Sequence, residues 1–167
     1  MVSADLEHEP VGSATLADSY TELSEILMPN DTNNLGRALG GSVLHWMDIC
    51  GAIAARRFSR RQVVTASMDH VDFLAHIALG DIVTVSGYAF DTGETSVDVA
   101  VTVRAERPAA DVRRDTATSF FTFVALDGEE RPTAVPALDC PTDDQRALRD
   151  RALEERRGRG RGEGESG

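Results

Sequence analysis

The strongest constraint on the fold is a helical apolar pattern over residues 42–58. Its apolar side chains recur at spacings of three and four residues, the period of an α-helix, and further apolar residues widen this face almost all the way round. These positions are Val43, Leu44, Met47, Ile49, Cys50, Ile53 and Ala54. A helix that is apolar on nearly every side is not stable on a surface, so we expect other structure to wrap around it. Ser42 is expected to be its N-cap or a first-turn residue.

After this helix the sequence has the period of β-strands, and the segment before the helix alternates imperfectly. A first strand is expected over residues 19–27, and four more follow the helix over residues 63–73, 82–90, 95–105 and 115–126. Short turn sequences separate the last of these strands, and strands joined in this way pair antiparallel. The order predicts an α+β domain in which an antiparallel sheet curls around one central helix.

One folded domain is expected, with an extension at each end. Residues 1–18 are predicted to be a disordered acidic arm, and residues 19–136 the folded domain. Residues 137–157 are expected to be a partly helical C-terminal extension, because weakly apolar positions recur at helical spacing over 143–157. Residues 158–167 have low sequence complexity and are predicted to be disordered.

The composition is strongly acidic. The net charge is −11, and all 17 basic residues are Arg. Such a protein repels nucleic acid and anionic membranes, so neither is expected as a partner. We interpret the bias as the adaptation of a halophilic protein to a salt-rich cytoplasm, where salt screens the self-repulsion. The alternative is an acidic protein from a GC-rich genome, which also favours Arg.

The sequence suggests neither a cofactor nor a metal. Cys50 and Cys140 are far apart and lack the spacing of metal ligands, and Cys50 is interpreted as part of the core. No apolar run is long enough to span a membrane, and the first residues, MVSADLEHEP, do not resemble a secretory signal. A cytoplasmic location is therefore predicted.

Asp48 is the candidate catalytic residue. It lies in the middle of the apolar helix, where a carboxylate is costly unless it is paired, hydrogen-bonded or open to a cleft. Carboxylates in such surroundings often serve as acids or bases in active sites. A structural role, as a loop cap or as one partner of a buried ion pair, is an equally open alternative.

The start of the helix carries further candidates. Gly40, Gly41 and Ser42 open it, and N–H groups at a helix N-terminus, next to residues without a side chain, can bind a developing oxyanion. The alternative is a turn that needs positive φ. Asn33 lies in the turn-rich loop before the helix, where an Asx turn is the alternative. Nucleophile elbows, phosphate loops and dinucleotide fingerprints are absent from the sequence.

These residues resemble the signature of acyl-CoA thioester hydrolases of the hotdog superfamily, a branch that includes single-domain bacterial enzymes and the brain-type acyl-CoA hydrolase. The resemblance covers residues 20–136 as an ordered set of motifs. They are Pro29-Asn30-Asp31-Thr32-Asn33, Gly36, Gly40-Gly41, Trp46-Met47-Asp48, Val64-Thr65-Ala66-Ser67, Val71-Asp72-Phe73, Gly80-Asp81-Ile82-Val83, Thr95-Ser96 and Phe121-Thr122-Phe123-Val124-Ala125-Leu126. It implies the hotdog fold and the hydrolysis of fatty acyl-CoA to a fatty acid and CoA.

The resemblance also implies a role for each site residue. Asp48 would be the catalytic carboxylate, as a general base or a nucleophile. Asn33, contributed by the partner subunit, would position the water or the thioester carbonyl, and the N–H of Gly41 would polarise that carbonyl. The implied substrate-binding residues are Gly40, Ser42, Val71, Asp72, Phe73, Thr95 and Ser96. Because such sites lie between subunits, a homodimer is the implied minimum and a hexamer, a trimer of dimers, the common assembly.

Two positions depart from the family pattern. Glu94 stands where a basic residue is common, and His76 where Pro is common, so the contacts to the CoA nucleotide are expected to differ. A non-catalytic acyl-CoA-binding hotdog module is the alternative function. A hotdog hydratase is disfavoured, because Ile53 stands where that chemistry places a His five residues after the Asp.

Overall fold

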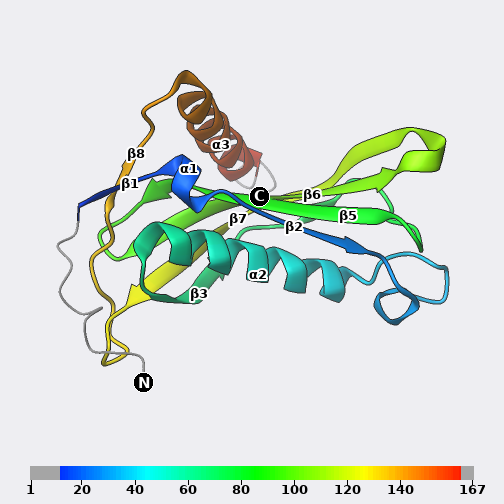
Figure 1. Cartoon of the computed structure of the whole chain (residues 1–167), viewed down its shortest axis with the longest axis horizontal. Helices are drawn as coiled ribbons and strands as arrows, with labels where there is room; N and C mark the ends of the chain where they lie inside the picture. The colour runs from blue at the N-terminus through cyan, green and yellow to red at the C-terminus, as the bar shows by residue number, and fades with distance from the viewer. Residues whose placement is uncertain (1–11, 163–167) are drawn as a thin grey trace.

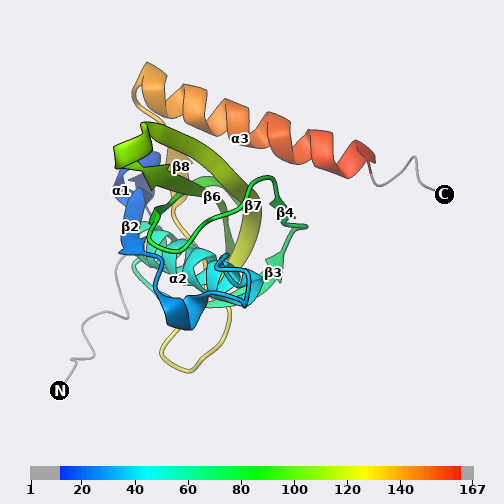
Figure 2. The same ribbon diagram turned by 90° about the vertical axis from the view of Figure 1, so that its right-hand side faces the viewer.

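The computed structural model describes residues 12–162. Its main sheet is antiparallel, with the strand order β2-β5-β6-β7-β3, and a short strand β4 also pairs with β7. The bounds are β2 Thr21–Ile26, β3 Gln62–Met68, β4 Asp72–Phe73, β5 Ile82–Thr92, β6 Ser96–Arg107 and β7 Val112–Leu126. Helix α2, Gly40–Ser59, lies along one face of this sheet (Figure 1). Figure 2 shows the sheet curling around α2, the hotdog arrangement that the sequence predicts.

Alternation along the long strands builds the core against α2. Val97, Val99, Val101 and Val103 of β6 all point inward and are fully buried. They face the fully buried stripe of α2, which is formed by Met47, Cys50, Ala54 and Phe58. Gly51 brings α2 close to the sheet, because a Cβ at this position would lie 2.9 Å from the ring of Phe123. Glycine at this position therefore lets α2 pack closely against β6 and β7.

The opposite face of the sheet is covered by α3, Asp143–Gly162 (Figure 1). A second apolar cluster lies between them, with Phe90, Ala100 and Phe120 from the sheet and Ala152 from α3 fully or almost fully buried. The helix predicted over residues 143–157 is thus present but longer. The prediction of disorder is wrong for residues 158–162, which continue the helix, while residues 163–167 lie outside the described residues.

The predicted N-terminal arm is also ordered in its last part. Residues 1–11 lie outside the described residues, but Ser13–Thr15 form β1 and Leu16–Ser19 form α1. The side chain of Leu16 is buried, and Thr15 and Asp18 cap the short helix reciprocally. β1 pairs in parallel with β8, Ala137–Asp139, a contact between segments too distant in sequence for local patterns to predict.

One further detail differs from the sequence predictions, and two others refine them. The strand predicted over residues 63–73 is broken into β3 and β4, with a bulge between Thr65 and Ser67. The N-cap of α2 is Leu39, so of the two places predicted for Ser42 the structure has the first turn. Short 3₁₀ turns, Pro29–Asp31 and Pro108–Ala110, lie in connections that were expected to be loops. Over the described part of the chain, no helix is both long and apolar enough to cross a membrane.

Candidate active site

Asp48 faces the edge strand β3. Its Oδ1 accepts a hydrogen bond from the hydroxyl of Thr65 at 2.7 Å, and the residue is only partly buried. Within residues 12–162, no ion pair neutralises this carboxylate and no donor contacts Oδ2. The structural alternative of a sealed ion pair therefore does not apply to the described chain. Asp48 thus has one carboxylate oxygen oriented by Thr65 and one available among the described residues.

Thr65 is the residue that sequence reasoning missed. It lies on β3, whose inner edge pairs with β7 and whose outer edge has no strand partner in the described chain. A hydroxyl on the strand directly after the helix was the available signal. It could not be used, because the strand pattern does not reveal which helix residue a given strand residue faces.

The surface around this pair is apolar and open. Ile49 of α2 is 40% exposed, and Val64 and Met68 of β3 are 48% and 46% exposed. Apolar side chains gathered along an unpaired strand edge are typical of a surface that is covered by another chain. The carboxylate of Asp48 thus lies beside a surface suited to contact with a second subunit.

The first turn of α2 leaves its backbone N–H groups without a side-chain cap in the described structure. Gly40 and Gly41 are the first two residues of the helix. Neither Gly has a positive φ, so the alternative of a strained turn is excluded. Among the described residues, a Cβ at Gly41 would meet nothing within 4 Å, so the fold of one subunit does not itself require glycine there. Free N–H groups and the helix dipole favour a negatively charged oxygen at this point.

Asn33 is fixed by its own loop. Its Oδ1 accepts hydrogen bonds from the backbone N–H groups of Leu35, at 2.9 Å, and Arg37, at 3.2 Å, so the expected Asx turn is present. Its Nδ2 donates to no acceptor within the described residues. Ser42 ties the same loop to the helix, because its hydroxyl donates to Asp31 Oδ1 at 2.9 Å. Asn33 is therefore an oriented and exposed donor beside the start of α2.

The predicted catalytic residues do not meet within one subunit. Asp48 lies seven positions after Gly41 in the helix, about 10 Å along the axis at the usual rise per residue. The described contacts of Asn33 lie in its own loop, and the side-chain contact of Asp48 is with Thr65. One chain therefore carries the predicted catalytic residues in two places, here called half-sites. The first is Asp48 with Thr65, and the second is the start of α2 with the loop of Asn33 that is tied to it through Asp31.

A cavity of about 210 Å³ opens at the N-terminal end of α2. It is lined by Arg37, Ala38, Gly40, Val43, Phe73, Ala75, His76 and Ile77. The ring of Phe73 would lie 3.7 Å from a Cβ at Gly40, and Phe73 is half exposed. Two predicted substrate-binding residues, Gly40 and Phe73, thus lie together, and His76 lies with them.

The other predicted substrate-binding residues are dispersed. Val71 packs against the core, and exposed Asp72 contacts the ring nitrogen Nε2 of His70 at 2.7 Å. Thr95 and Ser96 lie at the hairpin of β5 and β6. Ser96 pairs with Val124 of β7, whereas Phe73 pairs with Ala117 of the same strand. These two β7 positions are seven residues apart, about 23 Å along an extended strand. The structure of one chain does not bring Thr95 and Ser96 to the cavity.

Glu94, which stands where the family often has a basic residue, lies just before the hairpin residues Thr95 and Ser96. Glu94 is exposed, and its backbone carbonyl accepts the N–H of Val135 at 3.1 Å. In residues 12–162, no group of three or more His, Cys, Asp or Glu side chains is arranged to hold a metal ion.

Comparison with known proteins identifies the family. The Thioesterase superfamily matches residues 35–110. The chain is 39% identical over 128 residues to the uncharacterized acyl-CoA thioester hydrolase YkhA of Bacillus subtilis. The matched segment covers 77% of this chain and 74% of the relative. It is similar to a hexameric acyl-CoA thioesterase of known structure, with a TM-score of 0.81 and 33% identity over 90% of this chain and 97% of the other.

A Staphylococcus aureus acyl-CoA hydrolase solved with butyryl-CoA, CoA and CoA disulfide has a TM-score of 0.79 and 33% identity, covering 91% of this chain and 94% of the other. Its solved variants replace an Asp, an Asn and a Thr by Ala. The Asn precedes the Asp by 15 residues and the Thr follows it by 17, the same separations as those of Asn33, Asp48 and Thr65. By its fold and its sequence, the chain belongs to the hotdog-fold family of acyl-CoA thioester hydrolases.

Proposed function

We propose that the protein hydrolyses fatty acyl-CoA thioesters to a free fatty acid and CoA. The observation that carries this proposal is the Asp48 carboxylate. It lies in an otherwise apolar helix, is oriented by Thr65 and has no neutralising cation in the described chain. A thioester carbonyl is electrophilic enough for attack by a carboxylate-activated water, so no serine or cysteine nucleophile is needed.

Each half-site has a distinct task in this reaction. Asp48 takes a proton from the attacking water, or attacks the carbonyl itself, and Thr65 fixes its orientation through Oδ1. The first-turn N–H groups of α2, that of Gly41 above all, receive the negative charge that develops on the thioester oxygen. The Nδ2 of Asn33 adds a second donor or holds the water.

The two half-sites are proposed to come from different subunits. Within one chain they lie about 10 Å apart along α2. The open edge of β3 offers a surface where a second copy can pair, which would bring Asp48 and Thr65 of one subunit towards the helix start of the other. A homodimer is thus the smallest active unit. A hexamer, as in the similar thioesterase structure, is the proposed full assembly.

Other parts of the proposal concern substrate contacts and cellular location. The cavity beside Gly40 and Phe73 is proposed to border the substrate. Val71 and Asp72 would continue this border, with Ser42 at the helix start. The hairpin residues Thr95 and Ser96 would contact the substrate only if a neighbouring subunit brought them to the cavity. The cytoplasmic location stays a prediction of the sequence.

The function is tested by measuring thiol release from acyl-CoA substrates of increasing chain length with a chromogenic disulfide. We expect free CoA to appear in proportion to enzyme, with a rate that depends on acyl length. Binding of acyl-CoA without turnover at any chain length would instead identify a non-catalytic acyl-CoA-binding module.

A further inference from the structure

The C-terminal half of α3 is fastened to the sheet by two arginines. The guanidinium of Arg159 donates from Nη1 to the carbonyl of His70 and from Nη2 to the carbonyl of Thr118, both at 2.8 Å. Its central carbon also lies 5.2 Å from the centre of the Phe120 ring. Two charge-assisted hydrogen bonds and a cation–π contact fix this side chain in one orientation.

Arg156 makes a second set of contacts one turn earlier. Its Nη1 lies 2.8 Å from Asp98 Oδ2, and its Nε 3.4 Å from Asp69 Oδ2. The guanidinium also lies over the Phe90 ring, at 5.6 Å. The apolar contribution of α3 comes from its first half, where Ala152 is buried and Leu148 and Leu153 are partly buried. After Leu153 the described contacts of the helix with the sheet are those of Arg156 and Arg159, so this half is attached through its charges.

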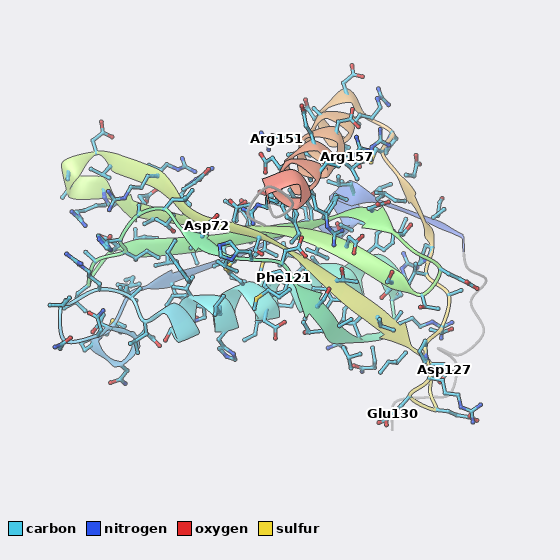
Figure 3. All side chains as sticks on the ribbon, turned by 180° about the vertical axis from the view of Figure 1, so that it is seen from behind. Asp72, Phe121, Asp127, Glu130, Arg151 and Arg157 are labelled. Atoms are coloured by element: carbon cyan, nitrogen blue, oxygen red, sulfur yellow. The ribbon has the colours of Figure 1, made fainter. Side chains whose placement is uncertain are left out.

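Both arginines hold the same connecting segment, residues 69–71 between β3 and β4. The Ser119 hydroxyl donates to the carbonyls of Asp69 and His70, at 2.9 and 3.2 Å, from the β7 side. Arg159 donates to His70 as well, and Arg156 contacts the side chain of Asp69. Figure 3 shows this region from behind, with Arg157 on α3 above the sheet and Asp72 on the sheet below it.

The clamped segment leads directly to the substrate side of the molecule. Three residues after His70, the ring of Phe73 lines the cavity at the start of α2, beside Gly40. Phe73 is held by only a two-residue strand, β4, whose partner residues on β7 are Ala117 and Thr118. Thr118 is the second residue that Arg159 contacts. The position of Phe73 therefore depends on a short segment that α3 secures from the opposite face.

We propose that Arg156 and Arg159 are positioning residues for the reaction. They act through residues 69–73 and set the place of Phe73 against the first turn of α2. This inference rests on the proposed function, because it assumes that the cavity borders the substrate. A purely structural role would be limited to keeping α3 on the sheet, and it would leave substrate affinity unchanged.

The test compares Arg159→Ala with Arg157→Ala in the full-length protein. Arg157 is an exposed residue of the same helix, two positions away, and it is the matched control. For Arg159→Ala we expect KM for acyl-CoA to rise about fivefold or more while kcat changes less than about twofold, since Asp48 is untouched. In Arg159→Lys the ammonium group can reach one of the two carbonyls but not both, so its KM should lie between that of the unmodified protein and that of Arg159→Ala. Unchanged KM in Arg159→Ala would overturn the proposal.

A second measurement does not depend on turnover. Hydrogen exchange of the backbone N–H groups of Asp69 and Leu74, which donate to Phe120 and Thr116 of β7, reports the opening of this segment. In Arg159→Ala we expect their exchange to accelerate roughly tenfold, with no change in Arg157→Ala. Unchanged exchange would refute the clamp. Faster exchange in a protein without thioesterase turnover would retain the clamp and reject the proposed function.

Discussion

The Thr65 hydroxyl lies 2.7 Å from Oδ1 of Asp48, joining the edge strand of the sheet to the middle of the central helix. This contact orients the carboxylate through Oδ1 and leaves Oδ2 available among the described residues. It also places the Asp48 carboxylate at the boundary of the subunit, because the outer edge of β3 has no partner strand in the described chain.

Replacement of Asp48 by Asn should remove most of the activity. The amide cannot accept a proton from water, and loss of a general base usually costs about 10²–10⁴-fold in rate. Kinetics of thiol release measure this loss, and circular dichroism checks that the fold is kept. Rates close to those of the unmodified protein would mean that another group activates the water.

Replacement of Thr65 by Val should lower kcat without a comparable change in KM. Val keeps the shape of the side chain but removes the donor, and a hydrogen bond to a charged group is worth about 1.5–3 kcal/mol, or roughly ten- to a hundredfold. Thr65→Ser keeps the hydroxyl and serves as the control. Equal activity in the Val and Ser variants would contradict the orienting role.

Mixing two inactive variants should restore activity if the site is shared. Asn33→Ala and Asp48→Asn homodimers each lack one half of both sites, whereas a mixed dimer has one site with both halves intact. After subunit exchange we expect up to about half of the full activity per mixed dimer, since such dimers hold one intact site of two. Each variant mixed only with itself is the control. No recovery despite demonstrated exchange would place Asn33 and Asp48 in the same subunit.

Asp81, in the turn before β5, should make the free energy of unfolding depend on pH in the acid range. Burial by itself raises the pKa of Asp81. The hydrogen bonds from the Arg107 guanidinium, at 2.8 and 3.2 Å, and from the Ala78 N–H outweigh this effect, so the pKa is lowered overall. Its contribution to stability is thus complete above the pKa of about 3.9 in the unfolded chain and is lost as pH falls through the lower folded value.

Urea unfolding of Asp81→Asn measures this contribution. We expect a loss of about 1–2 kcal/mol at pH 7 that shrinks as the pH falls below about 4, because the original carboxylate is then protonated too. Asp115→Asn, at an exposed ion pair with Arg104, is the control and should change stability little. A loss that is independent of pH would show that the charge of Asp81 is not the cause.

The two cysteine thiols should not react with a chromogenic disulfide in the native protein. Cys50 and Cys140 are both buried, and burial raises the pKa of Cys50 to about 12. Almost no Cys50 thiolate is therefore present at pH 8, and a chromogenic disulfide should report only CoA. Titration in denaturant should reveal both thiols. Rapid labelling of native protein would show that the core around α2 opens.

Local patterns predicted the elements that carry the site. The apolar stripe that contains Met47 and Cys50 predicted the central helix, and the alternation through Val97 and Val103 predicted the strand it packs on. These predictions succeeded because burial of one face leaves a period of 3.6 or 2 in the sequence. The same reasoning placed Asp48 on the helix, but it could not predict that Thr65 is the hydrogen-bond partner of Asp48. The interpretation of the acidic composition as salt adaptation stays a prediction.

The sequence by itself determined a buried helix with a carboxylate in it and a sheet that must enclose it. Only the tertiary structure decided that Thr65 meets Asp48, that β1 pairs with β8 and that Arg159 reaches His70. The reason is physical. Periodicity records which face of an element is buried, whereas contacts between distant residues depend on strand register and on how helices lie across the sheet, and no local pattern contains either.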